Sequence, residues 1–200
     1  LGSRGELFPS LKALGHTVLP LRPALAPVTC DMKPYKGLSG IRFDARASLL
    51  ENDALLAETT GNLIFTDYGL NGPAVMDLSH HVSARPSARL DLSLNPLFAA
   101  EPALRELIAR KRSIPTPLRT LLGAALPPKL VPVLLTRAGL HAEALVNQVN
   151  EDQLGKLFRV CTALPFRVTG VRGFEYCQVS AGGVPVSEVD PLNMRSLLVP

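Results

Sequence analysis

The segment from residue 65 to residue 76 combines polar side chains with two glycines where a strand would pass into a helix. It reads Phe-Thr-Asp-Tyr-Gly-Leu-Asn-Gly-Pro-Ala-Val-Met, and Pro73 stands where proline is favoured, in the first turn of a helix. A helix N-terminus that follows a glycine turn can accept an anion or a polar substrate atom. A tight strand-to-helix turn without any ligand explains the same pattern, so both interpretations stay open here.

A second glycine pair, Gly182-Gly183, follows a strand-like run and precedes Val184. Glycine has no Cβ, so backbone N–H groups at such a pair can approach a ligand that side chains would otherwise block. The alternative is again a tight turn. We expect this loop to form one wall of a site, with the turn from Tyr68 to Pro73 as its partner within the chain.

The sequence offers few groups for nucleotide or metal chemistry. A dinucleotide-binding fold needs a Gly-x-Gly-x-x-Gly turn after its first strand, and residues 1–200 contain none. Cys30, Cys161 and Cys177 are widely spaced, which predicts buried, reduced thiols. His80-His81 is the only histidine pair, and adjacent side chains point in different directions, so we expect no metal site.

No apolar stretch reaches the roughly 18–20 residues that a membrane span needs, and no signal peptide is visible. We therefore expect a cytoplasmic protein that does not bind membranes.

The net charge of +4 comes from the middle of the chain. Residues 97–164 hold nine basic and five acidic side chains, whereas the rest of the chain holds twelve of each. The densest basic run, Arg110-Lys111-Arg112, is typical of a solvated helix end. A patch for RNA or another anionic partner is the alternative. Aromatic residues make up only 5% of the chain, with no tryptophan, which argues against single-strand binding by base stacking.

The strands and helices that position these segments can be predicted from the spacing of apolar residues along the chain. Alternation at residues 41–49 and 89–94 predicts half-buried strands, and Thr60-Gly61-Asn62 between apolar runs predicts a hairpin. Short strands at such spacing favour a small antiparallel barrel or sandwich. Residues 96–164 switch to helical spacing interrupted by prolines, which predicts about four short helices. Asn150 and Gln153 are placed to cap the last of them.

Strands return at residues 166–169 and 174–179, and the glycines between them predict a second hairpin. The predicted fold is therefore α+β: a small antiparallel β-barrel interrupted by a small helical unit. Near the N-terminus, residues 11–16 indicate a short helix that ends at a glycine. This layout brings both ends of the chain together, as in an inserted domain that joins its host through two strands.

Several segments, taken in order, resemble the aminoacetone-oxidase or BaiN-like FAD-dependent oxidoreductases, a family of bacterial flavoproteins. Residues 65–73 match the family pattern Phe-Thr-His-x-Gly-Leu-Ser-Gly-Pro, with Asp67 in place of its His and Asn71 in place of its Ser. In the closing loop, Ser180, Asn193 and Arg195 replace the usual Thr, Thr and Glu. The remaining marks are Leu14-Gly15-His16-Thr17, Pro23-Ala24-Leu25, Gly182-Gly183-Val184, Glu188-Val189 and Asn193-Met194-Arg195-Ser196.

The resemblance implies that the chain is the middle, insert region of such a flavoprotein, with the flanking FAD-binding segments outside it. By this resemblance, residues 1–30 are a remnant of or linker from the FAD-binding domain, and residues 191–200 are the start of the return to it. Residues 31–95 together with 165–190 form the barrel subdomain, and residues 96–164 form the helical subdomain.

By the same resemblance, the intact protein moves hydride or electron pairs through FAD, with a nicotinamide as an optional partner, and the insert covers the flavin. The insert would shape the pocket for a small-molecule substrate, but residues 1–200 alone would not hold FAD tightly. Asp67 would stand where the family has a histidine that can transfer protons. A carboxylate can take over proton transfer only with a shifted pKa or through a bound water. Residues facing substrate or flavin would be Thr66, Tyr68, Gly69, Asn71, Gly72 and Pro73, and those touching the flavin ring Gly182, Gly183 and Val184.

Two other interpretations stay open. One is a module that binds RNA or another partner through the basic helical region. The other is a structural insert used for dimerisation.

Overall fold

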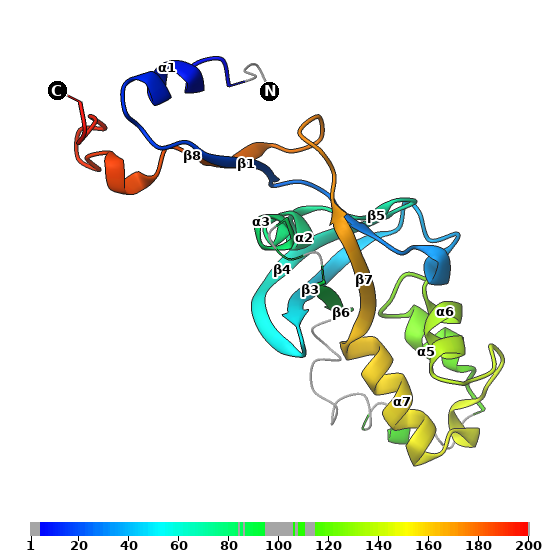
Figure 1. Cartoon of the computed structure of the whole chain (residues 1–200). Coiled ribbons are helices and arrows are strands. Elements are labelled where there is room, and N and C mark those ends of the chain that lie inside the picture. Colours follow the sequence, from blue (N-terminus) through cyan, green and yellow to red (C-terminus); the bar gives the residue numbers. More distant parts are fainter. Residues whose placement is uncertain are drawn as a thin grey trace.

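A closed antiparallel barrel of six strands forms the centre of the molecule (Figure 1). The structure is a computed structural model that describes residues 5–83, 85, 87–94, 106, 108–110 and 115–199. The strand order is β2-β5-β4-β3-β6-β7, and β7 pairs back with β2. A barrel accompanied by helices confirms the predicted α+β fold. The strands are β2 Val28–Cys30, β3 Arg42–Glu51, β4 Ala54–Thr66, β5 Gly69–Asn71, β6 Arg89–Ser93 and β7 Leu164–Val171.

Side chains alternate across the barrel wall as the sequence predicted. In β3, Ala45, Ala47 and Leu49 are buried, whereas Arg42 and Arg46 are exposed. Because the side-chain period of a strand is two, a slip by one residue would turn the whole apolar set to solvent, which fixes the register.

An aromatic cluster fills one end of the barrel. Tyr35, which ends the 3₁₀ helix η1 (Lys33–Tyr35), stacks on Phe166 with 4.1 Å between the ring centres. Phe65 meets Phe166 edge-on at 5.6 Å. The Tyr35 hydroxyl donates a hydrogen bond to the Pro165 carbonyl, so this buried polar group is satisfied.

The hairpin predicted at Thr60-Gly61-Asn62 is wrong, because these residues lie inside the continuous strand β4. The turn lies at Asn52 and Asp53, whose φ angles are 50° and 63°. Asparagine and aspartate tolerate this left-handed conformation better than most residues. Gly61 lies against helix α2 (Pro73–Met76), where a Cβ would be at an ordinary contact distance of 3.5 Å from the Ala74 nitrogen.

The hairpin predicted between residues 166–169 and 174–179 is also wrong. Both edges of β7 are occupied, one by β2 and the other by β6, so no edge is free for a hairpin partner. Residues 174–178 form a turn region instead, in which Arg172 lies over the Tyr176 ring. The chain then enters β8 (Val179–Gly183), which pairs outside the barrel.

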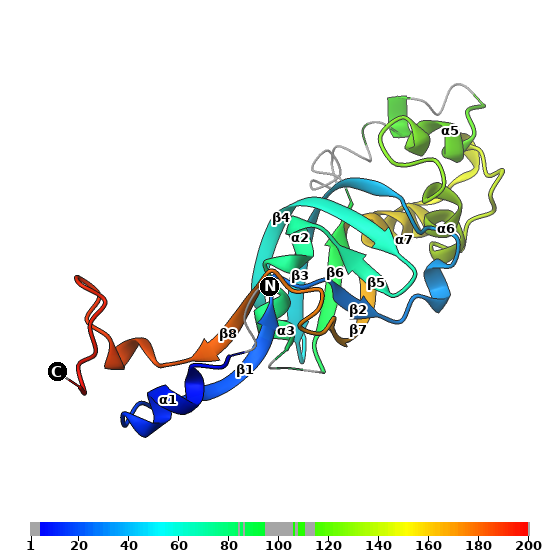
Figure 2. The same ribbon diagram turned by 90° about the horizontal axis from the view of Figure 1, so that it is seen from above.

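The helical unit lies between β6 and β7 in the chain and packs beside the barrel (Figure 2). The capping box predicted at Asn150 and Gln153 is confirmed. The described elements are α5 Leu118–Gly123, α6 Val131–Arg137, the 3₁₀ helix η3 Val146–Gln148 and α7 Glu151–Thr162. Lys111 and Arg112 of the basic run, and Leu104 and Leu107 of the predicted first helix, lie outside the described residues.

A terminal unit, residues 5–24 and 179–199, projects from the barrel in both views (Figures 1 and 2). It contains α1 (Phe8–Ala13), the antiparallel strands β1 (Leu19–Ala24) and β8, and the 3₁₀ helix η4 (Val186–Glu188). The remaining short helix, α3 (Ser79–Val82), lies beside the barrel where β1 enters it.

The large apolar side chains that remain exposed gather on the terminal unit. Val186, Leu192 and Met194 are 91%, 94% and 77% exposed, and Leu7 and Leu14 are also exposed. Among the described residues, no helix has the length and apolar character to cross a membrane. An apolar surface of this kind marks an interaction site.

Candidate functional site

The turn between β4 and β5 places Thr66 and Asp67 at the edge of a cavity of about 320 Å³. The Thr66 hydroxyl donates a 2.9 Å hydrogen bond to the Gly69 carbonyl, which fixes the turn. Asp67 is exposed, and Lys33 and Lys36 of the η1 segment line the same cavity. This arrangement can bind a polar or charged group from solution, with both a carboxylate and ammonium groups available.

The glycines of this turn are required by packing. A Cβ on Gly69 would lie 2.2 Å from the Val28 carbonyl oxygen in the neighbouring strand β2. A Cβ on Gly72, where φ is 97°, would lie 2.5 Å from the Asn62 carbonyl oxygen. The tight structural turn therefore accounts for both residues without a ligand.

Of the other predicted residues of this turn, Tyr68 lies just before β5, Asn71 ends that strand, and Gly72 and Pro73 follow it. The Tyr68 carbonyl accepts a 3.0 Å hydrogen bond from the Cys30 amide, and its ring lies under the Arg172 guanidinium. The Asn71 side chain accepts a 2.7 Å hydrogen bond from the Gly72 amide. Pro73 begins α2 in the first turn, as the sequence predicted. Strand β5 separates Asp67 from Asn71, Gly72 and Pro73, so the structure does not gather the predicted residues in one pocket.

Gly182 and Gly183 belong to β8, and Val184 follows that strand. A Cβ on Gly182 would lie 2.3 Å from the Pro20 carbonyl oxygen, and one on Gly183 would contact the Phe8 ring. The chain itself therefore fills the space on the Cβ side of Gly182 and contacts that of Gly183. Both views show β8 on the projecting ribbon, away from β5, so this loop and the Asp67 turn do not form opposite walls of one site (Figures 1 and 2).

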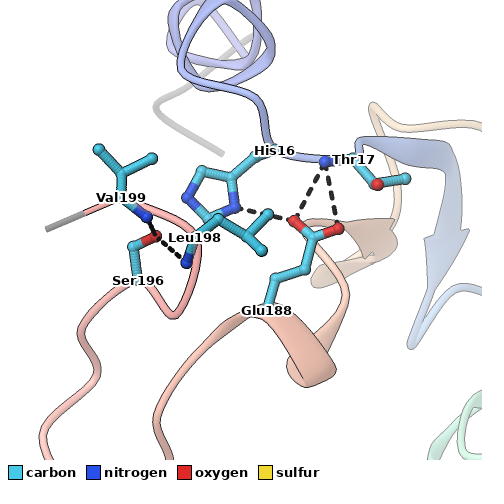
Figure 3. Close-up of polar contacts among 6 residues, drawn as sticks. All are labelled: His16, Thr17, Glu188, Ser196, Leu198 and Val199. Atoms are coloured by element: carbon cyan, nitrogen blue, oxygen red, sulfur yellow. Dashed lines mark hydrogen bonds and ion pairs between the residues drawn. The ribbon is translucent and has the colours of Figure 1, made fainter.

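The terminal unit brings together two sequence marks from opposite ends of the chain (Figure 3). His16 Nδ1 lies 2.8 Å from Glu188 Oε2, and the Thr17 amide donates to both oxygens of the same carboxylate. The hydrogen bonds from Thr17, and next the one from His16, hold the pKa of Glu188 below its usual value. We call these three residues the clasp.

His16 of the clasp borders a depression of about 660 Å³ that Leu11, Leu14, Arg195 and Ser196 also line. His16 is only 8% exposed, and its Nε2 faces the side on which Ser196 and Val199 lie (Figure 3). Glu188 fixes the ring through Nδ1, and a carboxylate partner of this kind sets the tautomer of a histidine. Sequence reasoning did not include His16 and Glu188 among the site residues, although both lie in the marks that carry the family resemblance.

Metal and thiol chemistry find no support in the described residues. No group of three or more His, Cys, Asp or Glu side chains in them could hold a metal ion. Cys30, Cys161 and Cys177 are free and buried. Burial raises the pKa of Cys30 and of Cys161 to about 12, which keeps these thiols protonated and unreactive.

The sequence of the chain is similar to those of several known proteins. The chain is 28% identical over 98% of its length to the 3-dehydro-bile acid delta(4,6)-reductase of Clostridium scindens. It is 29% identical to the ribosomal RNA dihydrouridine synthase of Escherichia coli and 26% identical to that of Haemophilus influenzae. It covers 49%, 48% and 47% of these proteins, so it spans about half the length of the curated relatives it matches.

The model of one protein family matches residues 22–179, from β1 through the barrel and the helical unit to the first residue of β8. That family is described as the HI0933-like protein barrel and H2TH domain. The match covers most of the chain, and both named parts, a barrel and a helical unit, are present here. The chain belongs to the HI0933-like barrel and H2TH domain family.

Proposed function

We propose that this chain is the insert of a FAD-dependent oxidoreductase, which covers the flavin and shapes the pocket of a small-molecule substrate. The chain's family membership and its similarity to a reductase support this proposal. FAD, when bound, supplies two-electron transfer chemistry. The residues that hold it would belong to the rest of a longer protein, because residues 1–200 contain no dinucleotide-binding glycine motif.

The observation that carries the proposal is the terminal unit. Its two antiparallel strands connect the barrel with a segment whose exposed side chains are largely apolar, Val186 and Leu192 foremost. Such a surface suits a partner domain that covers it. We assign the flavin-binding domain of the same polypeptide as that partner, with the barrel held over the flavin through the β1–β8 ribbon.

Within the insert, Thr66 and Asp67 are the polar groups that we assign to the substrate. Both line the cavity beside Lys33 and Lys36, where they can bind and orient a polar group. A role for Asp67 in proton transfer is part of the proposal, as is a location in the cytoplasm, with which the three free cysteines agree.

The test is the visible absorption spectrum of the complete protein that contains this sequence. We expect a bound flavin that a nicotinamide or a substrate reduces. Val186→Asp should lower the flavin content severalfold, because it places a charge in the covered surface. Leu55→Asp, at a 59% exposed position on the β3–β4 hairpin, should leave the content unchanged. A complete protein that carries no flavin and takes none up would overturn the proposal.

A second candidate is an enzyme that acts on RNA, since two of the relatives are ribosomal RNA dihydrouridine synthases. The identity to the Escherichia coli synthase, 29%, is as high as the 28% to the bile-acid reductase, so the comparison leaves both substrate classes open.

A further inference from the structure

Three neighbouring cavities with cationic side chains lie on the barrel, and two of them are also lined by residues of the helical unit. The first, about 320 Å³, is lined by Lys33 and Lys36; the second, about 600 Å³, by Arg42 and Lys129; and the third, about 360 Å³, by Arg137 and Arg167. The first cavity shares Ser39 with the second and Tyr35 with the third, so the three are neighbours on the surface. We call these six cationic side chains the basic band.

Most of the positive charge of the basic band is not neutralised. Within the described part of the chain, ion pairs reach only Arg167 of the six, whose Nη2 lies 3.4 Å from Asp31 Oδ2. Arg89, at the edge of the third cavity, is held by Asp91 and Asp53 and is therefore not counted in the band. The other acidic residue in the lining is Asp67. A surface on which cations outnumber carboxylates concentrates ligands of negative charge.

The scaffold under the band is rigid. Arg137, in the last turn of α6, lies over the Tyr35 ring with 5.2 Å from the guanidinium carbon to the ring centre. That ring is 2% exposed and stacks on Phe166 inside the barrel. Both views show the η1 segment, in blue after β2, beside α6 (Figures 1 and 2). The helical unit and the barrel thus each supply cations to a single surface.

We propose that the basic band binds the phosphate backbone of base-paired RNA. A group of cations around neighbouring cavities, most of them without an ion-pair partner among the described residues, suits a polyanion whose charges repeat at short intervals. Among the described residues that line the three cavities, Tyr35 is the one aromatic residue, and it is buried, so these residues offer no platform on which an unpaired base could stack. Recognition without stacking or base contacts suits paired RNA, which proteins bind through its shape and its phosphates.

This inference rests on the second candidate function, for which it names the surface that receives the substrate. RNA affinity is measured without flavin and flavin content without RNA, so the failure of one proposal is distinguishable from the failure of the other.

The test is the affinity of the purified chain for a labelled RNA stem-loop, followed by fluorescence anisotropy over a range of salt concentrations. We expect Lys36→Glu with Lys129→Glu to weaken binding at least about tenfold and to lower the slope of log affinity against log salt by about 1–2. Lys12→Glu with Arg22→Glu makes the same charge change on the terminal unit and should leave both quantities nearly unchanged. Circular dichroism verifies that each variant is folded.

Arg137→Glu provides a second probe from the helical unit and should weaken binding to a similar extent. Equal losses in the band variant and in the Lys12/Arg22 control would overturn the proposal, because binding would then follow net charge alone. Tighter binding of unpaired poly-uridine than of the stem-loop would also overturn it, as would equal competition by polyglutamate.

Discussion

Glu188 joins the two ends of the chain through a single carboxylate. It accepts hydrogen bonds from Thr17 and from His16, which is 172 residues away in the sequence. Because these bonds depress its pKa, the ionised form stabilises the folded terminal unit. That stabilisation is present above the ordinary glutamate pKa of about 4.3 and is lost as the pH falls through the lower, folded value.

At the residue scale, His16→Ala should raise the pKa of Glu188 toward the ordinary value without restoring it fully, because the larger effect of Thr17 persists. The measurement is an NMR titration of the Glu188 carboxyl carbon in the wild type and the variant. His80→Ala, at an exposed histidine on α3, is the matched control and should not shift the titration. An unchanged midpoint in His16→Ala would contradict the clasp.

Element geometry explains which predictions from the sequence succeeded. The strands at residues 41–49 and 89–94 were predictable because one face of each is buried, so apolar and polar residues alternate along the sequence. Gly61 misled the prediction because a glycine between polar residues has the same local signature in a turn as it has here, inside β4 and against α2. The β1–β8 pairing agrees with the predicted meeting of the two chain ends. Which residues meet there, those of the clasp included, depends on contacts across nearly the whole chain that no local pattern encodes.

At the element scale, Gly69→Ala tests the close approach of β5 to β2. The new methyl group would meet the Val28 carbonyl at 2.2 Å, so we expect a loss of about 3 kcal/mol or more in the free energy of unfolding. Gly37→Ala also has a positive φ, 86°, but meets no atom within 4 Å, and should cost about 1–2 kcal/mol. Urea unfolding measures both, and equal losses would mean that backbone strain alone, not proximity, requires Gly69.

At the scale of the whole molecule, the terminal unit and the barrel differ in how they are held. The barrel closes on itself around a buried core, whereas β1 and β8 form a two-stranded sheet. A ribbon of two strands has little independent stability in water. The predicted division of the chain into domain segments stays a prediction, which the proposed docking of the terminal unit would explain.

Hydrogen exchange tests this difference directly. In the 200-residue chain we expect amides of β1 and β8 to exchange much faster than those of β3 and β4, because the ribbon opens locally at little cost. In the complete protein the ribbon amides should become protected, while those of β3 and β4 should not change. Ribbon protection that is equal in both proteins would argue against a covering domain.

Barrel closure also has a consequence for the order of events during synthesis. Val28 of β2 pairs with Val171 of β7, and the whole helical unit is made between them. On the ribosome, β2 and β6 therefore wait with unpaired edges until β7 has emerged from the exit tunnel. Such long-range pairing is slow, and open strand edges invite aggregation in the meantime. Synthesis of the helical unit thus delays barrel assembly. During this delay, a chaperone that binds nascent chains would find the unpaired edges of β2 and β6 exposed.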